Sequence, residues 1–167
     1  FNKLRLDVNR SQSYIIDSHW AIYCENYLEE FHIPYVHKGL TKAINLDNYN
    51  TILLENAVLQ TAVCSNKKNA INLDKKALDS SKNMYAYYYW IFPNLMINFY
   101  AWGISINIIE PIERQKTRIK YIVFTFPNYK MQNNNKSDLK TVELEDQNVV
   151  ESVQKGINSS FYKNGRY

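Results

Sequence analysis

The sequence contains few cysteines. Only Cys24 and Cys64 occur among its 167 residues, and neither belongs to a C-x-x-C, C-x-H or C-x-x-H pattern. The paired ligands of a zinc site or an iron–sulfur cluster are therefore missing from this chain. Because a free cysteine usually behaves as a small hydrophobic residue, we expect both thiols to be buried.

Long apolar runs and blocks of like charge are also missing. The most apolar stretch, residues 85–109, is interrupted by Pro93, Gly103 and three asparagines, so it cannot supply the roughly 20 apolar residues of a membrane span. The 20 basic and 16 acidic residues give a mild net charge of +4 and are not gathered in blocks, which argues against a nucleic-acid partner. Residues 1–10 lack the apolar segment of a secretory signal, so we expect a cytoplasmic protein.

Periodic hydrophobicity is abundant. In residues 19–30, apolar side chains recur at three- and four-residue spacings, which predicts an amphipathic helix. Pro34 should end that helix and leave residues 33–40 irregular. Near the other end of the chain, residues 142–161 show the same spacing and predict a second, long helix.

Between the two predicted helices, the alternation of side chains is typical of antiparallel strands. In residues 103–109 three isoleucines alternate with Ser105 and Asn107, which predicts that the isoleucine face is dry and covered by the terminal helix. The ranges 66–83 and 127–138 are polar and are predicted as loops. The predicted strands are residues 51–55, 58–65, 85–91, 95–100, 103–109 and 117–126.

These elements predict one domain over residues 1–167 with an α+β architecture. A curved antiparallel sheet of six or more strands would grip the long C-terminal helix around a cavity. This is the helix-grip arrangement of START and Bet v 1-like domains.

Two of the three histidines, His32 and His37, lie five residues apart beside acidic residues. Imidazole suits a divalent transition metal, and a carboxylate could complete a three-ligand face of the kind that holds non-haem Fe(II). Glu29 precedes His32 by about one helical turn, so we expect it to be a further ligand or a partner of that imidazole. Glu25 and Glu30 are alternatives to Glu29, either of which could be a solvated charge.

Asp146 is the candidate for the third ligand. It precedes Val149 and Val150 by three and four positions and should share their sheet-facing side, where an unpaired carboxylate would be costly without a cation. Glu151 and Gln154 on the same helix either orient Asp146 or belong to a solvated face. The remaining histidine, His19, is expected to cap or border the first helix rather than bind metal.

The segment ENYLEEFHIPYVHKGL, residues 25–40, resembles the iron-site motif of Rieske-type ring-hydroxylating oxygenase α subunits. DQNVVESVQKG, residues 146–156, resembles a later segment of the same family, and the two occur in the family's order. The similarity extends over essentially the whole chain, including the tyrosine-rich YAYYYWIFPNLMINFYAWG. It is strongest to the branch that acts on choline, carnitine and related quaternary ammonium compounds.

This resemblance implies an Fe(II) held by His32, His37 and Asp146, with Glu29 at the acidic position that couples the iron to a Rieske cluster. In the family, that [2Fe-2S] cluster belongs to a neighbouring subunit of a homotrimer. An NAD(P)H-dependent reductase supplies the cluster with electrons. Such an iron uses O₂ to hydroxylate a small organic substrate or to cleave it oxidatively. The 14 tyrosines and three tryptophans could include a cage for a quaternary ammonium group, although most should serve packing.

The chain also departs from the family. It lacks the N-terminal domain with the cluster ligands and stops before a segment that relatives carry, so we expect a catalytic domain that is truncated or separately encoded. His19, Ala21 and Lys38 stand where the family more often has Asn, Lys and Pro. Two alternatives stay open at this point, namely an inactive ligand-binding remnant of the same fold and a zinc hydrolase, although the H-E-x-x-H pattern is missing.

Overall fold

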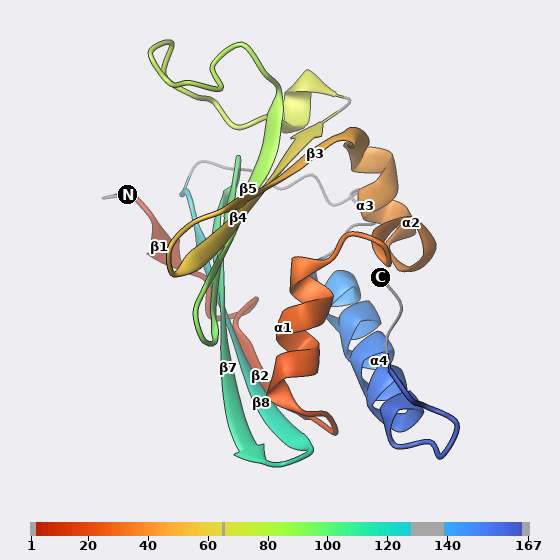
Figure 1. Cartoon of the computed structure of the whole chain (residues 1–167). Helices are drawn as coiled ribbons and strands as arrows, with labels where there is room; N and C mark the ends of the chain where they lie inside the picture. Colours follow the sequence, from red (N-terminus) through yellow and green to blue (C-terminus); the bar gives the residue numbers. More distant parts are fainter. Residues whose placement is uncertain (1–2, 65, 128–138, 165–167) are drawn as a thin grey trace.

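The computed structural model describes residues 3–64, 66–127 and 139–164. A single curved antiparallel sheet forms one layer, and helices α1 and α4 lie side by side against one of its faces (Figure 1). The strands are β1 (Arg5–Leu6), β2 (Gln12–Ile16), β3 (Ile44–Leu53), β4 (Ala57–Cys64), β5 (Met84–Ile91), β6 (Leu95–Tyr100), β7 (Gly103–Glu113) and β8 (Lys116–Thr125). The helices are α1 (Trp20–Leu28), α2 (Ile33–Val36), α3 (Lys38–Ala43), the short 3₁₀ helix η1 (Lys67–Asn69) and α4 (Leu139–Ile157).

The sheet is a meander with an N-terminal addition. Its order is β1-β8-β7-β6-β5-β4-β3, and β2 also pairs with β8. All six predicted strands are present, and the predicted helix-grip arrangement of a curved sheet and a long C-terminal helix is confirmed. Strands β1 and β2 were not predicted, because one spans two residues and the alternation in the other is only five residues long.

Gly103 is required where β6 turns into β7. Its φ of +152° lies in a region that residues with a side chain rarely adopt, and a Cβ at this position would overlap the backbone carbonyl of Phe124 on β8. This close approach is where Gly103 pairs with Thr125, at the end of the β7–β8 hairpin that lies far from its turn.

The prediction of which face of β7 is covered by the helices is wrong. Ser105 and Asn107 are buried, whereas the three isoleucines that alternate with them are only half-buried. Helices α1 and α4 cover the Ser–Asn face, where Asn98 donates a hydrogen bond to Ser105 and Asn107 donates to Glu143. Alternation in a sequence separates two faces of a strand but does not say which one the helices will cover, and here the covered face is polar.

Helix α1 begins one residue after its predicted start and ends at Leu28, well before Pro34, so the prediction that Pro34 ends this helix is wrong. The Nδ1 atom of His19 accepts a hydrogen bond from the backbone N–H of Ala21, so His19 caps the helix as expected. The prediction of an irregular segment over residues 33–40 is wrong, because α2 and α3 occupy it. Pro34 lies in the first turn of α2. Backbone N–H groups in that turn have no intrahelical acceptor, so a proline, which lacks the N–H, loses no hydrogen bond there.

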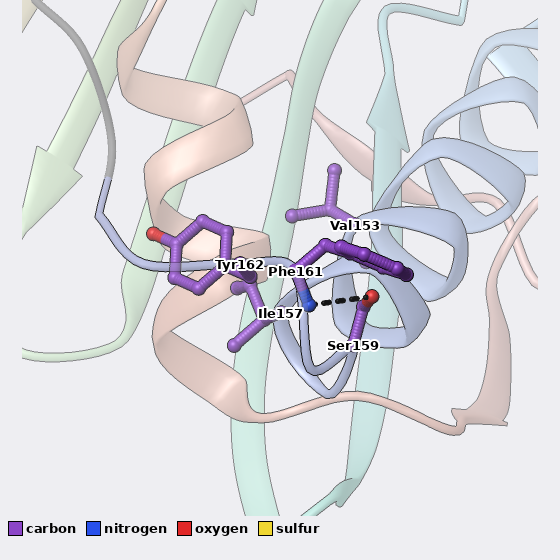
Figure 2. A pocket seen from close by; sticks show the side chains of 6 residues that line it. Val153, Ile157, Ser159, Phe161 and Tyr162 are labelled. Atoms are coloured by element: carbon purple, nitrogen blue, oxygen red, sulfur yellow. Dashed lines mark hydrogen bonds between the residues drawn. The ribbon is translucent and has the colours of Figure 1, made fainter.

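Helix α4 starts earlier than predicted and ends at Ile157, so Phe161 lies beyond it and is exposed. The predicted loop over residues 127–138 lies outside the described residues except for Pro127. At the C-terminal end of α4, Val153, Ile157 and Tyr162 line an open hollow (Figure 2). Both cysteines are buried, as predicted. Among the described residues, no helix is both long enough and apolar enough to cross a membrane.

Candidate metal centre

Three side chains from distant parts of the chain converge beside α1. The Nε2 atoms of His32 and His37 are 3.1 Å apart, and the Oδ1 atom of Asp146 lies 3.5 Å from the first and 3.0 Å from the second. His32 follows α1, His37 joins α2 to α3, and Asp146 lies in the N-terminal half of α4. The structure thus brings together all three residues that the sequence singled out as ligands.

The three atoms have the spacing that one transition-metal ion requires. Ligands about 2.1 Å from an ion, in adjacent positions of an octahedron, lie about 3.0 Å from one another. The observed separations of 3.0, 3.1 and 3.5 Å are short enough for two imidazoles and one carboxylate to bind one ion together. An ion held by these three ligands alone would keep positions for other molecules.

The imidazole of His32 is held by Glu29, which the sequence had favoured over Glu25 and Glu30. The Glu29 carboxylate contacts Nδ1 of His32 through Oε1 and accepts the backbone N–H of His32 through Oε2 at 3.2 Å. Glu29 is the C-cap of α1 with an extended backbone, so the contact does not arise from the predicted helical turn. Holding Nδ1 on a carboxylate leaves Nε2 directed at the other two candidate ligands.

The imidazole of His37 is held from both edges by consecutive residues of α4. Its Nδ1 atom lies 2.8 Å from Oε2 of Glu145, and its Nε2 atom lies 3.0 Å from Oδ1 of Asp146. The ring is nearly inaccessible, with 2% of the side chain exposed, compared with 13% for His32. Burial alone would lower the pKa of His37, but the hydrogen bonds and charges of Asp146 and Glu145 raise it above its ordinary value.

Asn26 completes the set of contacts around Asp146. Its Nδ2 atom donates to Oδ1 of Asp146 at 2.8 Å. Each of the three candidate ligands therefore has a polar partner, namely Glu29 for His32, Glu145 for His37 and Asn26 for Asp146. Partners of this kind fix the orientation of metal ligands.

A second polar cluster lies one helical turn before Asp146. Glu143 accepts hydrogen bonds from the hydroxyls of Tyr14 at 2.7 Å and Tyr23 at 3.0 Å, and from the side-chain amide of Asn107 at 3.2 Å. These partners belong to β2, α1 and β7, so Glu143 ties α4 to three other elements. Burial of the carboxyl, assisted by the nearby negative charge of Asp146, raises the pKa of Glu143 to about 7.

Sequence reasoning missed Asn26, Glu143 and Glu145. Two features of the sequence could have indicated Glu145 and Asn26, namely the acidic pair at positions 145 and 146 and the asparagine three residues before Glu29. Each of these features also fits a solvated helix face. The alternative that Glu151 and Gln154 orient Asp146 is wrong. Glu151 accepts the backbone N–H of Asp17, and Gln154 accepts that of His19, so both hold the start of α1.

Comparison with known protein families identifies the family of this chain. The family model described as "Ring hydroxylating alpha subunit (catalytic domain)" matches residues 4–167. The chain belongs to this family. The resemblance seen in its two sequence motifs is therefore confirmed, and the acidic and imidazole side chains of the candidate centre lie in a domain whose relatives include monooxygenases.

Curated relatives point to one branch of the family. The chain is 32% identical over 163 residues to a choline monooxygenase of Arabidopsis thaliana described as chloroplastic, covering 93% of this chain and 37% of the relative. It is 25% identical over 152 residues to a carnitine monooxygenase oxygenase subunit of Acinetobacter pittii, covering 87% of this chain and 40% of the relative. The chain thus spans about two fifths of the length of the curated relatives it matches.

Solved structures support the fold. A quaternary ammonium Rieske monooxygenase, described in connection with carnitine oxidation and inter-subunit electron transfer, superposes with a TM-score of 0.77 at 21% identity, covering 97% of this chain and 43% of that one. Naphthalene 1,2-dioxygenase from Rhodococcus sp. superposes with a TM-score of 0.65 at 12% identity, covering 97% of this chain and 46% of that one. Both matches agree with the curved sheet and helices described above.

Proposed function

We propose that the chain is the catalytic domain of a non-haem iron oxygenase that oxidises a small quaternary ammonium compound with O₂. The observation that carries the proposal is the convergence of His32, His37 and Asp146, whose three atoms are spaced for one ion. These three residues would hold Fe(II), which supplies the redox chemistry that no side chain can perform. Glu29, through its contact with His32, would lie between this centre and the source of electrons.

The family match favours iron over zinc. Two imidazoles and one carboxylate also occur in catalytic zinc sites. The chain, however, belongs to the ring-hydroxylating α-subunit family, and its relatives include choline and carnitine monooxygenases. The H-E-x-x-H pattern of zinc hydrolases is missing from the sequence. A zinc hydrolase therefore has less support than an oxygenase.

The charge of the site supports a cationic substrate. Among the described residues, the charged side chains that contact the two imidazoles are all carboxylates, contributed by Glu29, Glu145 and Asp146. Tyr27 of α1 and Tyr88 of β5 pack edge to face, and electron-rich rings of this kind attract a quaternary ammonium group. The names of the choline and carnitine monooxygenases among the relatives agree with this substrate class.

The partners of the proposed enzyme follow from the same assignment. We propose that electrons come from a Rieske [2Fe-2S] domain in trans and an NAD(P)H-dependent reductase, and that residues 1–167 form one catalytic domain within a homotrimer. The cluster ligands are absent from this sequence, so the electron donor must be a separate polypeptide or another part of a longer protein.

The first test is metal content. Protein reconstituted with Fe(II) under anaerobic conditions, desalted and analysed for metal should hold about one iron per chain. His32→Ala, His37→Ala and Asp146→Ala should each lose it, whereas Glu151→Gln, a change on the same helix as Asp146, should retain it. Wild-type protein that retains no iron would contradict the proposal.

The second test is turnover. The iron-loaded chain, supplied with a Rieske donor, a reductase and NADH, should consume O₂ and form product from choline or carnitine. Iron binding without product from any quaternary amine would favour the ligand-binding remnant over the enzyme.

A further inference from the structure

We infer that Glu145 is a positioning residue that fixes the imidazole of His37 for metal binding, an inference that rests on the proposed function. Glu145 and Asp146 are neighbours in sequence and approach opposite edges of one ring. Successive residues of a helix point about 100° apart, so only a ring placed between the two directions can meet both side chains. His37 occupies that place.

The contact of Glu145 with His37 differs from an ordinary surface ion pair. The Glu145 side chain is one-third exposed, but the ring that it meets is 2% exposed. If Glu145 were removed, the Nδ1–H of His37 would become a buried donor without its acceptor, and the ring could turn or change tautomer. A turn of the ring would direct Nε2 away from His32 and Asp146, and the other tautomer would place the proton on Nε2 and occupy the lone pair that binds a metal.

Glu145 has the same relation to His37 that Glu29 has to His32. In both pairs a carboxylate meets Nδ1 and leaves Nε2 facing the other candidate ligands. Glu29 comes from the end of α1 and Glu145 from α4, so the two imidazoles are oriented independently. Carboxylate partners of metal-binding histidines typically change metal affinity by about 10- to 100-fold when they are lost.

The test compares Glu145→Ala and Glu145→Gln with the matched control Glu151→Ala on the same helix. Fe(II) affinity is measured by competition with a chelator under anaerobic conditions, without turnover. We expect Glu145→Ala to weaken binding by about 10- to 100-fold. Glu145→Gln, which keeps an acceptor oxygen, should weaken it less, and Glu151→Ala should stay within about twofold of the wild type.

A second readout needs no metal. In nitrogen-15 NMR spectra of the metal-free protein, His37 should show a protonated Nδ1 that exchanges slowly with water, and Glu145→Ala should abolish that signal while Glu151→Ala preserves it. Unchanged Fe(II) affinity together with an unchanged His37 signal in Glu145→Ala would overturn the inference. If the wild type bound no iron, the proposed function would fail separately, and the metal-free spectra would still decide whether Glu145 orients the ring.

Discussion

The two imidazoles of the candidate centre are held in contrasting ways. His32 finds its carboxylate partner three residues earlier in the chain, at Glu29, whereas His37 meets Glu145 and Asp146 more than 100 residues later. The first pair needs only a local turn after α1. The second pair forms only when α4 has docked, so half of the centre depends on the tertiary fold and half on local sequence.

Glu143 is the main polar anchor of that docking. Its contacts with Tyr14, Tyr23 and Asn107 join α4 to strands and to α1 one turn away from Asp146. The contrast between the two imidazoles therefore predicts that disturbing the α4 side will cost the metal-free protein more stability than disturbing the His32 side.

The largest expected effect concerns pH and Glu143. The carboxyl ionises near its ordinary value of 4.5 in the unfolded chain and near 7 in the folded chain, so between these values the folded chain holds one more proton. The free energy of unfolding should therefore fall as pH rises from about 5 to 7.5, by up to about 3 kcal/mol from this group. Urea unfolding of metal-free protein across this range measures the fall.

Glu143→Gln should remove most of that pH dependence. The amide has no charge to desolvate, and its oxygen can accept the tyrosine hydroxyls. Its NH₂ can donate to Asn107 once the Asn107 amide turns over, because Asn107 now presents its own NH₂ to Glu143 and its oxygen lacks a hydrogen-bond partner among the described residues. A variant that kept the full slope would show that another group causes it. His37, whose pKa is also raised, should contribute a smaller slope in the same direction in both proteins, because its charged form is stabilised in the folded state.

The next effect compares His37→Ala with His32→Ala in the metal-free protein. Removing the buried His37 ring leaves Glu145 and Asp146 without their shared partner and should lower the free energy of unfolding by about 2 kcal/mol. Removing His32, which is more exposed and held locally, should cost under about 1 kcal/mol. Denaturant midpoints at one pH measure both values, and circular dichroism checks that both variants fold. Equal losses would remove the distinction between a local and a tertiary half of the centre.

Much of the fold and of the candidate centre could be predicted from short segments of the sequence. The spacing of Glu29 to His32, the helix before them and the helix that bears Asp146 could all be predicted, since each depends on residues a few positions apart. The same holds for the hairpins of the meander, whose turns and alternation lie within short segments.

Features that depend on which surfaces meet were not predictable. Glu145 and Asp146 are adjacent acids, and only the placement of His37 gives them different roles. The buried face of β7 was assigned the wrong way round, because Asn107 is buried against the acid Glu143 rather than against an apolar helix. Pro34 was read as a helix terminator, although its place in the first turn of α2 suits a proline equally well.

The central claim is that one ion bridges both halves of the centre. Crystals of the protein soaked with Fe(II) without oxygen, with diffraction recorded on both sides of the iron absorption edge, test it most directly. The account predicts one strong anomalous peak about 2.1 Å from Nε2 of His32, Nε2 of His37 and a carboxylate oxygen of Asp146. A peak that touched only one of these residues, or iron bound elsewhere on the chain, would contradict it.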